Sequence, residues 1–138
     1  MQIELKRLDD AFHFEAKSDT GNIAFIDAGE SIGGHNKGVR PMQMLLMALG
    51  GCSAIDIVSI LKKQRQTIED FQISMDGQRE KDKEPSLFET IHVTFKLKGN
   101  LEKDKVERAV ALSMDKYCSV AKTLEKTAKI TYSVFIND

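Results

Sequence analysis

Two cysteines are the side chains of this chain best suited to covalent chemistry. Cys52 lies within a long apolar run, and Cys118 lies just before a short predicted helix. A thiol just outside a helix N-terminus lies in the positive field of the helix dipole, which favours the reactive thiolate. Asp56 follows Cys52 by about one helical turn, where it can orient a neighbouring group or cap a neighbouring loop. The alternative is that both cysteines are core residues, because free cysteine is among the most buried residue types.

The three histidines add little to this chemistry. His13, His35 and His92 lie on a predicted strand, in a loop and on a polar strand face. No local spacing of cysteine and histidine indicates a metal site, so we expect no metal. The glycine-rich segment 29–38 does not match a phosphate-binding fingerprint, and no Gly-x-Ser-x-Gly elbow occurs.

The element that must position Cys52 is a predicted helix over Met42–Leu61, with Pro41 at its first position. The adjacent Gly50 and Gly51 cost roughly 1 kcal/mol each relative to alanine inside a helix. They therefore indicate close packing, or room beside Cys52 for another backbone or a ligand.

Twenty helical residues span ~30 Å, which is about the thickness of a bilayer core. Four polar residues interrupt the run, and an aspartate near the centre of a membrane span is rare. We therefore expect a helix of a soluble protein and no membrane partner. Because the helix is apolar nearly all round, a second subunit is expected to cover part of it. The interrupting residues are Gln43, Ser53, Asp56 and Ser59.

The remaining segments predict short strands and two further helices, and hence one α+β domain over residues 1–138. Strands are expected at Gln2–Leu8, from Phe12 to Phe14, around Ile23 and Phe25, over Ile68–Met75, from Pro85 to Leu97, and over Ile130–Ile136. A helix capped by Asn100 is expected to reach about Lys116, and a shorter one capped by Ser119 is expected to reach about Thr127. A charged turn is expected over Gly77–Glu84.

Composition narrows the class of protein. The 138 residues carry 20 Lys and Arg against 21 Asp and Glu, a formal net charge of −1. This balance argues against a large basic surface for nucleic acid, so no nucleic-acid partner is expected. Two cysteines are too few for a disulfide-rich secreted scaffold. Residues 1–10 do not form a secretory signal, so we expect a cytoplasmic protein, in which thiols are kept reduced.

Two segments resemble the OsmC/Ohr family, the osmotically induced and organic hydroperoxide resistance proteins. The first runs from Arg40 to Asp56 (RPMQMLLMALGGCSAID), and the second from Asp115 to Ala121 (DKYCSVA). The spacing of a proline, an apolar helix and a cysteine matches the family, as does a second cysteine before a short helix. The GGCSAID form is similar to a branch of OsmC-like proteins distinct from the core peroxidases.

The resemblance implies an OsmC-like fold, with antiparallel sheets around a long central apolar helix in an intertwined homodimer. It implies a thiol peroxidase that reduces small organic hydroperoxides in the oxidative stress response. Cys52 would form a sulfenic acid, Cys118 would condense with it to a disulfide, and an external dithiol would reduce the pair. No metal or organic cofactor is implied.

The sequence departs from the family at the groups that support the first cysteine. The acidic position after Pro41 holds Met42 and Gln43, and the arginine of the family has as candidates only Arg7 and Arg40. Arg40 and Gln43 lie ~13 to 18 Å from Cys52 along a straight helix. If they serve a site, we expect them to serve that of the other chain in a dimer.

Two further hypotheses fit the same residues. One is a non-catalytic protein that binds a small apolar ligand at the dimer interface, suggested by the missing acid and the glycine pair. The other is a thiol redox sensor, in which a disulfide changes the shape of the protein without turnover.

Overall fold

The computed structural model describes all residues from Met1 to Asp138. The chain forms two compact units, Met1–Leu45 and Leu46–Asp138, and the long helix α1 begins in the first and continues into the second. Each unit has its own three-stranded sheet. The fold is α+β, as the sequence predicts.

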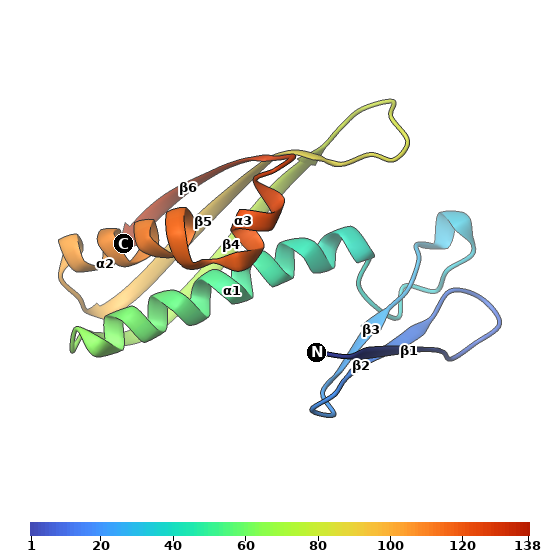
Figure 1. The fold of residues 1–138 in the computed structure, drawn as a ribbon, viewed down its shortest axis with the longest axis horizontal. Coiled ribbons are helices and arrows are strands. Elements are labelled where there is room, and N and C mark those ends of the chain that lie inside the picture. The colour runs from blue at the N-terminus through green and yellow to red at the C-terminus, as the bar shows by residue number, and fades with distance from the viewer. The chain divides into compact units, whose positions relative to one another are not determined.

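The sheet of the first unit is an antiparallel meander of β1 (Ile3–Arg7), β2 (Phe14–Ser18) and β3 (Ile23–Ile26) (Figure 1). The second strand begins at Phe14, two residues later than expected. The reason is local, because the Asp9 carboxylate accepts hydrogen bonds from the backbone N–H groups of Ala11 and His13 at 3.0 and 3.1 Å. These bonds hold the preceding residues in a turn.

The glycine-rich loop of the first unit, which contains the short 3₁₀ turn η1 (Glu30–Ile32), is organised around the buried Asp27. The Asp27 carboxylate accepts backbone N–H groups from Ala28, His35 and Lys37. These bonds, the one from Lys37 foremost, hold the pKa of Asp27 below its usual value. A Cβ on Gly34 would lie 2.1 Å from the Ala28 carbonyl oxygen, so the loop can close only around glycine there.

Helix α1 spans Pro41–Lys63, as its apolar run predicts. Its start is capped by Gln43, whose Oε1 accepts the backbone N–H of Arg40 at 2.9 Å. One stripe of the helix is buried at four-residue spacing, whereas apolar side chains on other faces are exposed. The stripe consists of Leu49, Ser53, Ile57 and Leu61.

The two glycines of α1 differ in their surroundings. A Cβ on Gly50 would lie 2.8 Å from Sδ of Met75, so Gly50 allows α1 to pack closely on the second sheet. A Cβ on Gly51 would meet nothing within 4 Å. The pair therefore provides both things that the sequence suggested, close packing at Gly50 and open space next to Cys52.

The second unit contains β4 (Thr67–Arg79), β5 (Phe88–Asn100) and β6 (Lys129–Ile136), in that spatial order. β4 and β5 are antiparallel, but β5 and β6 are parallel, so this sheet is mixed where antiparallel pairing was expected. β4 continues through Gly77, which was expected in a turn, because it stays paired with β5 as far as Arg79.

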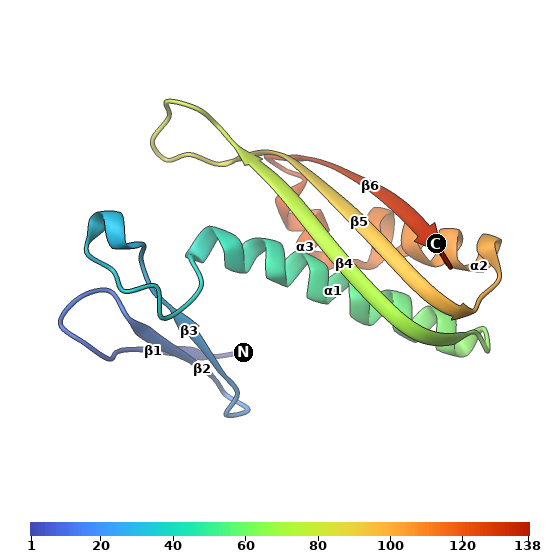
Figure 2. The same cartoon turned by 180° about the vertical axis from the view of Figure 1, so that it is seen from behind.

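The helices lie on one face of this second sheet, and the other face is open (Figures 1 and 2). Alternate residues of β5 point to the helices and are buried, as the two-residue periodicity predicts. They are Ile91, Val93, Phe95 and Leu97.

Three short helical segments join β5 to β6: α2 (Lys103–Leu112), the π-helical turn η2 (Ser113–Tyr117) and α3 (Ser119–Leu124). Asn100 belongs to β5 and caps no helix. Glu102 precedes α2, and its backbone N–H donates to Oε1 of Gln66 at 2.7 Å. Cys118, and not Ser119, is the N-cap of α3.

We predict that Phe95→Ala destabilises the protein by about 3–5 kcal/mol, because Phe95 is fully buried between the sheet and its helices. Phe135→Ala is the matched control, since Phe135 is 43% exposed. The control should cost about 1 kcal/mol or less. Urea unfolding measures both values, and equal losses would contradict this assignment of the core.

Candidate functional site

Three reactive side chains from distant parts of the second unit converge at one place. Cys52 and Asp56 belong to α1, and Cys118 lies between η2 and α3. The two sulfur atoms and a carboxylate oxygen all lie within 4.8 Å of one another. Both cysteines are free thiols. The fold therefore brings together the two cysteines and the aspartate that the sequence singled out.

Ser113 connects the two sides of this site. Its Oγ donates to Oδ2 of Asp56 at 3.0 Å, and its carbonyl oxygen accepts the backbone N–H of Cys118 at 2.8 Å. The second bond closes the π-helical turn, which ends the helical run and places Cys118 at the start of α3. Ser113 was not a candidate in the sequence, because a single serine in a predicted helix gives no signal of a partner 57 residues away.

The two thiols differ in accessibility. Cys118 is fully buried, whereas Cys52 is half-buried and lies next to the open space at Gly51. A molecule arriving from solvent therefore meets Cys52 first.

Burial above all, together with the neighbouring Cys52, raises the pKa of the Cys118 thiol from an ordinary value of 9.0 to about 11. The Ala121 N–H donates to the Cys118 sulfur at 3.4 Å and acts in the opposite direction, as the helix-terminus argument expects. Desolvation is the larger effect here, so the expectation of a thiolate at this helix start is wrong for Cys118.

The other candidates for site support are engaged within the first unit. The Arg7 guanidinium donates to the carbonyl oxygens of Asp10 and Ala11. Arg40 donates to the carbonyl oxygens of Asp27 and Gly38 and to the side chain of Asn36, and so fastens the glycine-rich loop.

Gln43 caps its own helix through Arg40, nine residues before Cys52 along α1. No lysine or arginine forms a hydrogen bond or ion pair with Cys52, Asp56 or Cys118 in this chain. The thiols therefore lack the cationic partner that usually activates a reactive cysteine.

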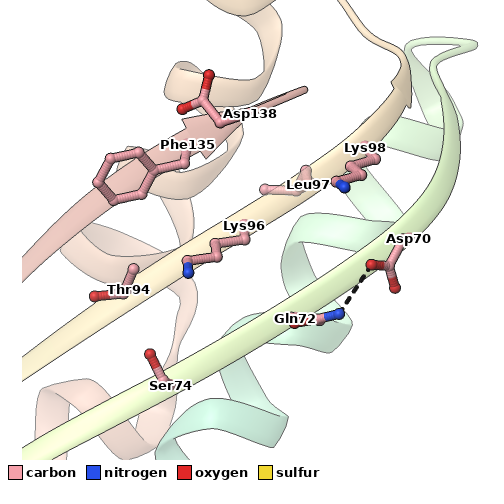
Figure 3. Close-up of a pocket in the computed structure, with 9 residues that line it drawn as sticks. All are labelled: Asp70, Gln72, Ser74, Thr94, Lys96, Leu97, Lys98, Phe135 and Asp138. Atoms are coloured by element: carbon pink, nitrogen blue, oxygen red, sulfur yellow. Dashed lines mark hydrogen bonds between the residues drawn. The ribbon is translucent and has the colours of Figure 1, made fainter.

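A hollow of about 610 Å³ lies elsewhere, on the open face of the second sheet (Figure 3). Its lining comes from β4, β5 and the C-terminal end of the chain and is mostly polar and charged. The residues are Asp70, Gln72, Ser74, Thr94, Lys96, Leu97, Lys98, Phe135 and Asp138. Cys52 belongs to α1 and Cys118 begins α3, and both helices lie on the other face of the sheet, so this hollow does not belong to the thiol site (Figure 2).

The fold and the paired thiols define a class of protein. Residues 34–133 match the family model of the OsmC-like proteins, which covers well over half of the sequence. The chain therefore belongs to the OsmC-like family.

The chain is also similar to individual proteins. The chain is 47% identical to protein YhfA of Escherichia coli (strain K12), over 76% of this chain and 85% of the relative. It is 33% identical to a hypothetical protein of Aquifex aeolicus VF5, with a TM-score of 0.80 over 99% of this chain and 97% of the other. An organic hydroperoxide resistance protein OsmC from Legionella pneumophila shares the fold at 15% identity, with a TM-score of 0.67 over 98% and 97% of the two chains.

Helix α1 is long and apolar enough to cross a membrane when length and composition alone are considered. In its most apolar window, 28% of the residues are buried. Core helices of soluble proteins pass the same test, so this property is weak evidence for a membrane span.

We predict that the Cys118 thiol titrates above the ordinary value for a cysteine. In a Cys52→Ser variant the pKa of Cys118 should stay above 9.0, because burial is the largest cause of its shift. Cys118 is then a neutral thiol at pH 7 and becomes a thiolate only in strongly alkaline solution. The ultraviolet absorbance of the thiolate, followed against pH, measures this. A midpoint below 9.0 would show that the α3 N-terminus outweighs burial.

Proposed function

We propose that this protein is a thiol-dependent peroxidase that reduces organic hydroperoxides, with Cys52 as the attacking thiol and Cys118 as the resolving thiol. The observation that carries the proposal is the convergence of one accessible and one buried cysteine, 66 positions apart in the sequence, with sulfurs no more than 4.8 Å apart. The organic hydroperoxide resistance proteins among the structural relatives support it at the level of the family.

The reaction would proceed in three steps. The Cys52 thiolate attacks an oxygen of the hydroperoxide, the O–O bond breaks, and the alkoxide takes up a proton and leaves as an alcohol. Cys52 is then a sulfenic acid. The Cys118 thiol displaces its hydroxyl group as water and forms a disulfide. An external dithiol reduces this disulfide by two successive exchanges and is itself oxidised.

The surroundings of the thiols suit these roles. Cys52 is the half-buried thiol next to open space, so it can meet a substrate. Cys118 is kept neutral by burial, so it does not compete for the peroxide. Ile55, 73% exposed on the same helix in the single chain, would give a site at the dimer interface an apolar wall, which suits an alkyl group better than hydrogen peroxide.

The protein would act as a homodimer in the cytoplasm. Helix α1 leaves Met47, Ile55 and Val58 exposed by 53%, 73% and 42%, and a second copy of the chain would cover this apolar surface. A partner chain could also bring Arg7, Arg40 or Gln43 to the thiols, which have no cation of their own.

One observation favours a second candidate function. No basic side chain of this chain forms a hydrogen bond or ion pair with Cys52, whereas a peroxidase needs an activated thiol. A non-catalytic protein that binds a small apolar ligand at the dimer interface needs no such activation. Peroxide turnover separates the two functions.

We predict that the reduced protein consumes cumene hydroperoxide in excess dithiothreitol and that Cys52→Ser abolishes this consumption. Cys118→Ser should form a sulfenic acid on Cys52, which a dimedone-type probe traps. Ser74→Ala, on the opposite side of the sheet, is the control and should match the unmodified protein. Unchanged consumption by Cys52→Ser would exclude the proposed role of this thiol. Absence of consumption in the unmodified protein would favour the binding protein.

We predict a dimer in solution that Ile55→Lys weakens by roughly 2 kcal/mol or more, because the substitution buries an unpaired charge. Phe135→Lys, a similar change on the open face of the second sheet, should leave the dimer intact. Light scattering at several protein concentrations measures both. A monomer at all concentrations would contradict the proposed assembly.

A further inference from the structure

The thiol site contains three groups that can lose a proton, two thiols and a carboxyl, and no lysine or arginine is bound to them. Cys52, Asp56 and Cys118 can each carry a negative charge, and their sulfur and oxygen atoms lie within 4.8 Å of one another. No lysine or arginine of the chain binds to any of them. A positive ion bound between the three groups would balance these charges.

The three groups match the ligands of a thiophilic divalent cation. Zinc binds cysteine sulfur at ~2.3 Å and carboxylate oxygen at ~2.0 to 2.2 Å, in tetrahedral sites. Such an ion holds two sulfurs ~3.8 Å apart. Because the sulfurs of Cys52 and Cys118 are at most 4.8 Å apart, each ligand needs to move by less than about 1 Å to bind it.

The groups around the ligands favour this arrangement. Ser113 donates its hydroxyl to Oδ2 of Asp56, which fixes the carboxylate and leaves Oδ1 free to bind an ion. The Ala121 N–H donates to the sulfur of Cys118 and stabilises negative charge on it. Outer groups of this kind orient the ligands of metal sites.

Three protein ligands leave one position of a tetrahedral ion open. Cys52 and Asp56 are half-buried, so a water molecule from solvent can fill this position. Sites with three protein ligands and one water are typical of exchangeable or catalytic zinc, whereas structural zinc has four protein ligands.

We propose that the reduced protein binds one zinc ion through Cys52, Asp56 and Cys118, the three side chains that α1 and the start of α3 bring together. Binding converts both thiols to zinc thiolates and releases their two protons to solvent. Ion binding itself does not depend on the proposed peroxidase. If that function holds, zinc and peroxide exclude each other, because both require the same Cys52 sulfur.

The test uses cadmium as a spectroscopic probe, because cadmium thiolates absorb in the ultraviolet. Reduced full-length protein is titrated with Cd²⁺ without oxygen, and zinc is then added in competition. We expect one ion per chain, displacement by zinc, and loss of the absorbance in Cys52→Ser and in Cys118→Ser. Absence of a band in the reduced protein would overturn the proposal, whatever the peroxide assay shows.

Variants that keep both thiols test the third ligand. Asp56→Asn should weaken binding by at least ~10-fold, and Ser113→Ala, which frees the carboxylate from its hydrogen bond, by ~10- to 100-fold. Asp70→Asn removes an exposed carboxylate on the other side of the sheet and should change nothing. Far-ultraviolet circular dichroism checks that each variant is folded. If folded Asp56→Asn binds cadmium as tightly as the unmodified protein, the three-ligand site is wrong.

Discussion

The packing of one stripe of α1 on the second sheet is the constraint on which the site depends. Leu49, Ser53, Ile57 and Leu61 recur every four residues and are fully buried, so the rotation of the helix about its axis is set. Cys52 and Asp56 each precede a residue of this stripe, at the edge of the packed face. Their half-buried state follows directly, since they lie between the core and solvent.

The close approach at Gly50 extends the same constraint to the sheet. Met75 of β4 lies where a side chain at position 50 would be, so α1 lies nearer to β4 than an alanine would allow without adjustment. The segments between β5 and β6 pack on the same face, and Ser113 there reaches Asp56. Helix, sheet and connection are thus joined around the two thiols.

Much of the fold follows from patterns that local chemistry dictates. The apolar run predicts α1, and the alternation along Ile91, Val93, Phe95 and Leu97 predicts the buried face of β5. The parallel pairing of β6 could not be predicted, because it depends on a connection whose path is set by tertiary packing. The π-helical turn at 113–117 could not be predicted either, because it contains neither the glycine nor the proline that usually marks a break in a helix.

The candidate site, like the fold, could be predicted only in part from the sequence. Cys52, Cys118 and Asp56 could be named from residue type and spacing, but the Asp56–Ser113 bond needs the folded chain. The ionisation of Cys118 shows why local reasoning is incomplete. Its place at a helix start argues for a lower pKa, whereas its complete burial, visible only in the fold, raises the pKa.

The position of α1 in the chain has a consequence for synthesis on the ribosome. More than half of the sequence follows Lys63, including all of the sheet on which α1 packs. At ~5–20 residues per second these residues take on the order of 10 s to emerge. During that interval the apolar helix and the Cys52 thiol have no native surface to pack on. The burial of α1 is therefore completed only after β6, the last strand of that sheet, has emerged.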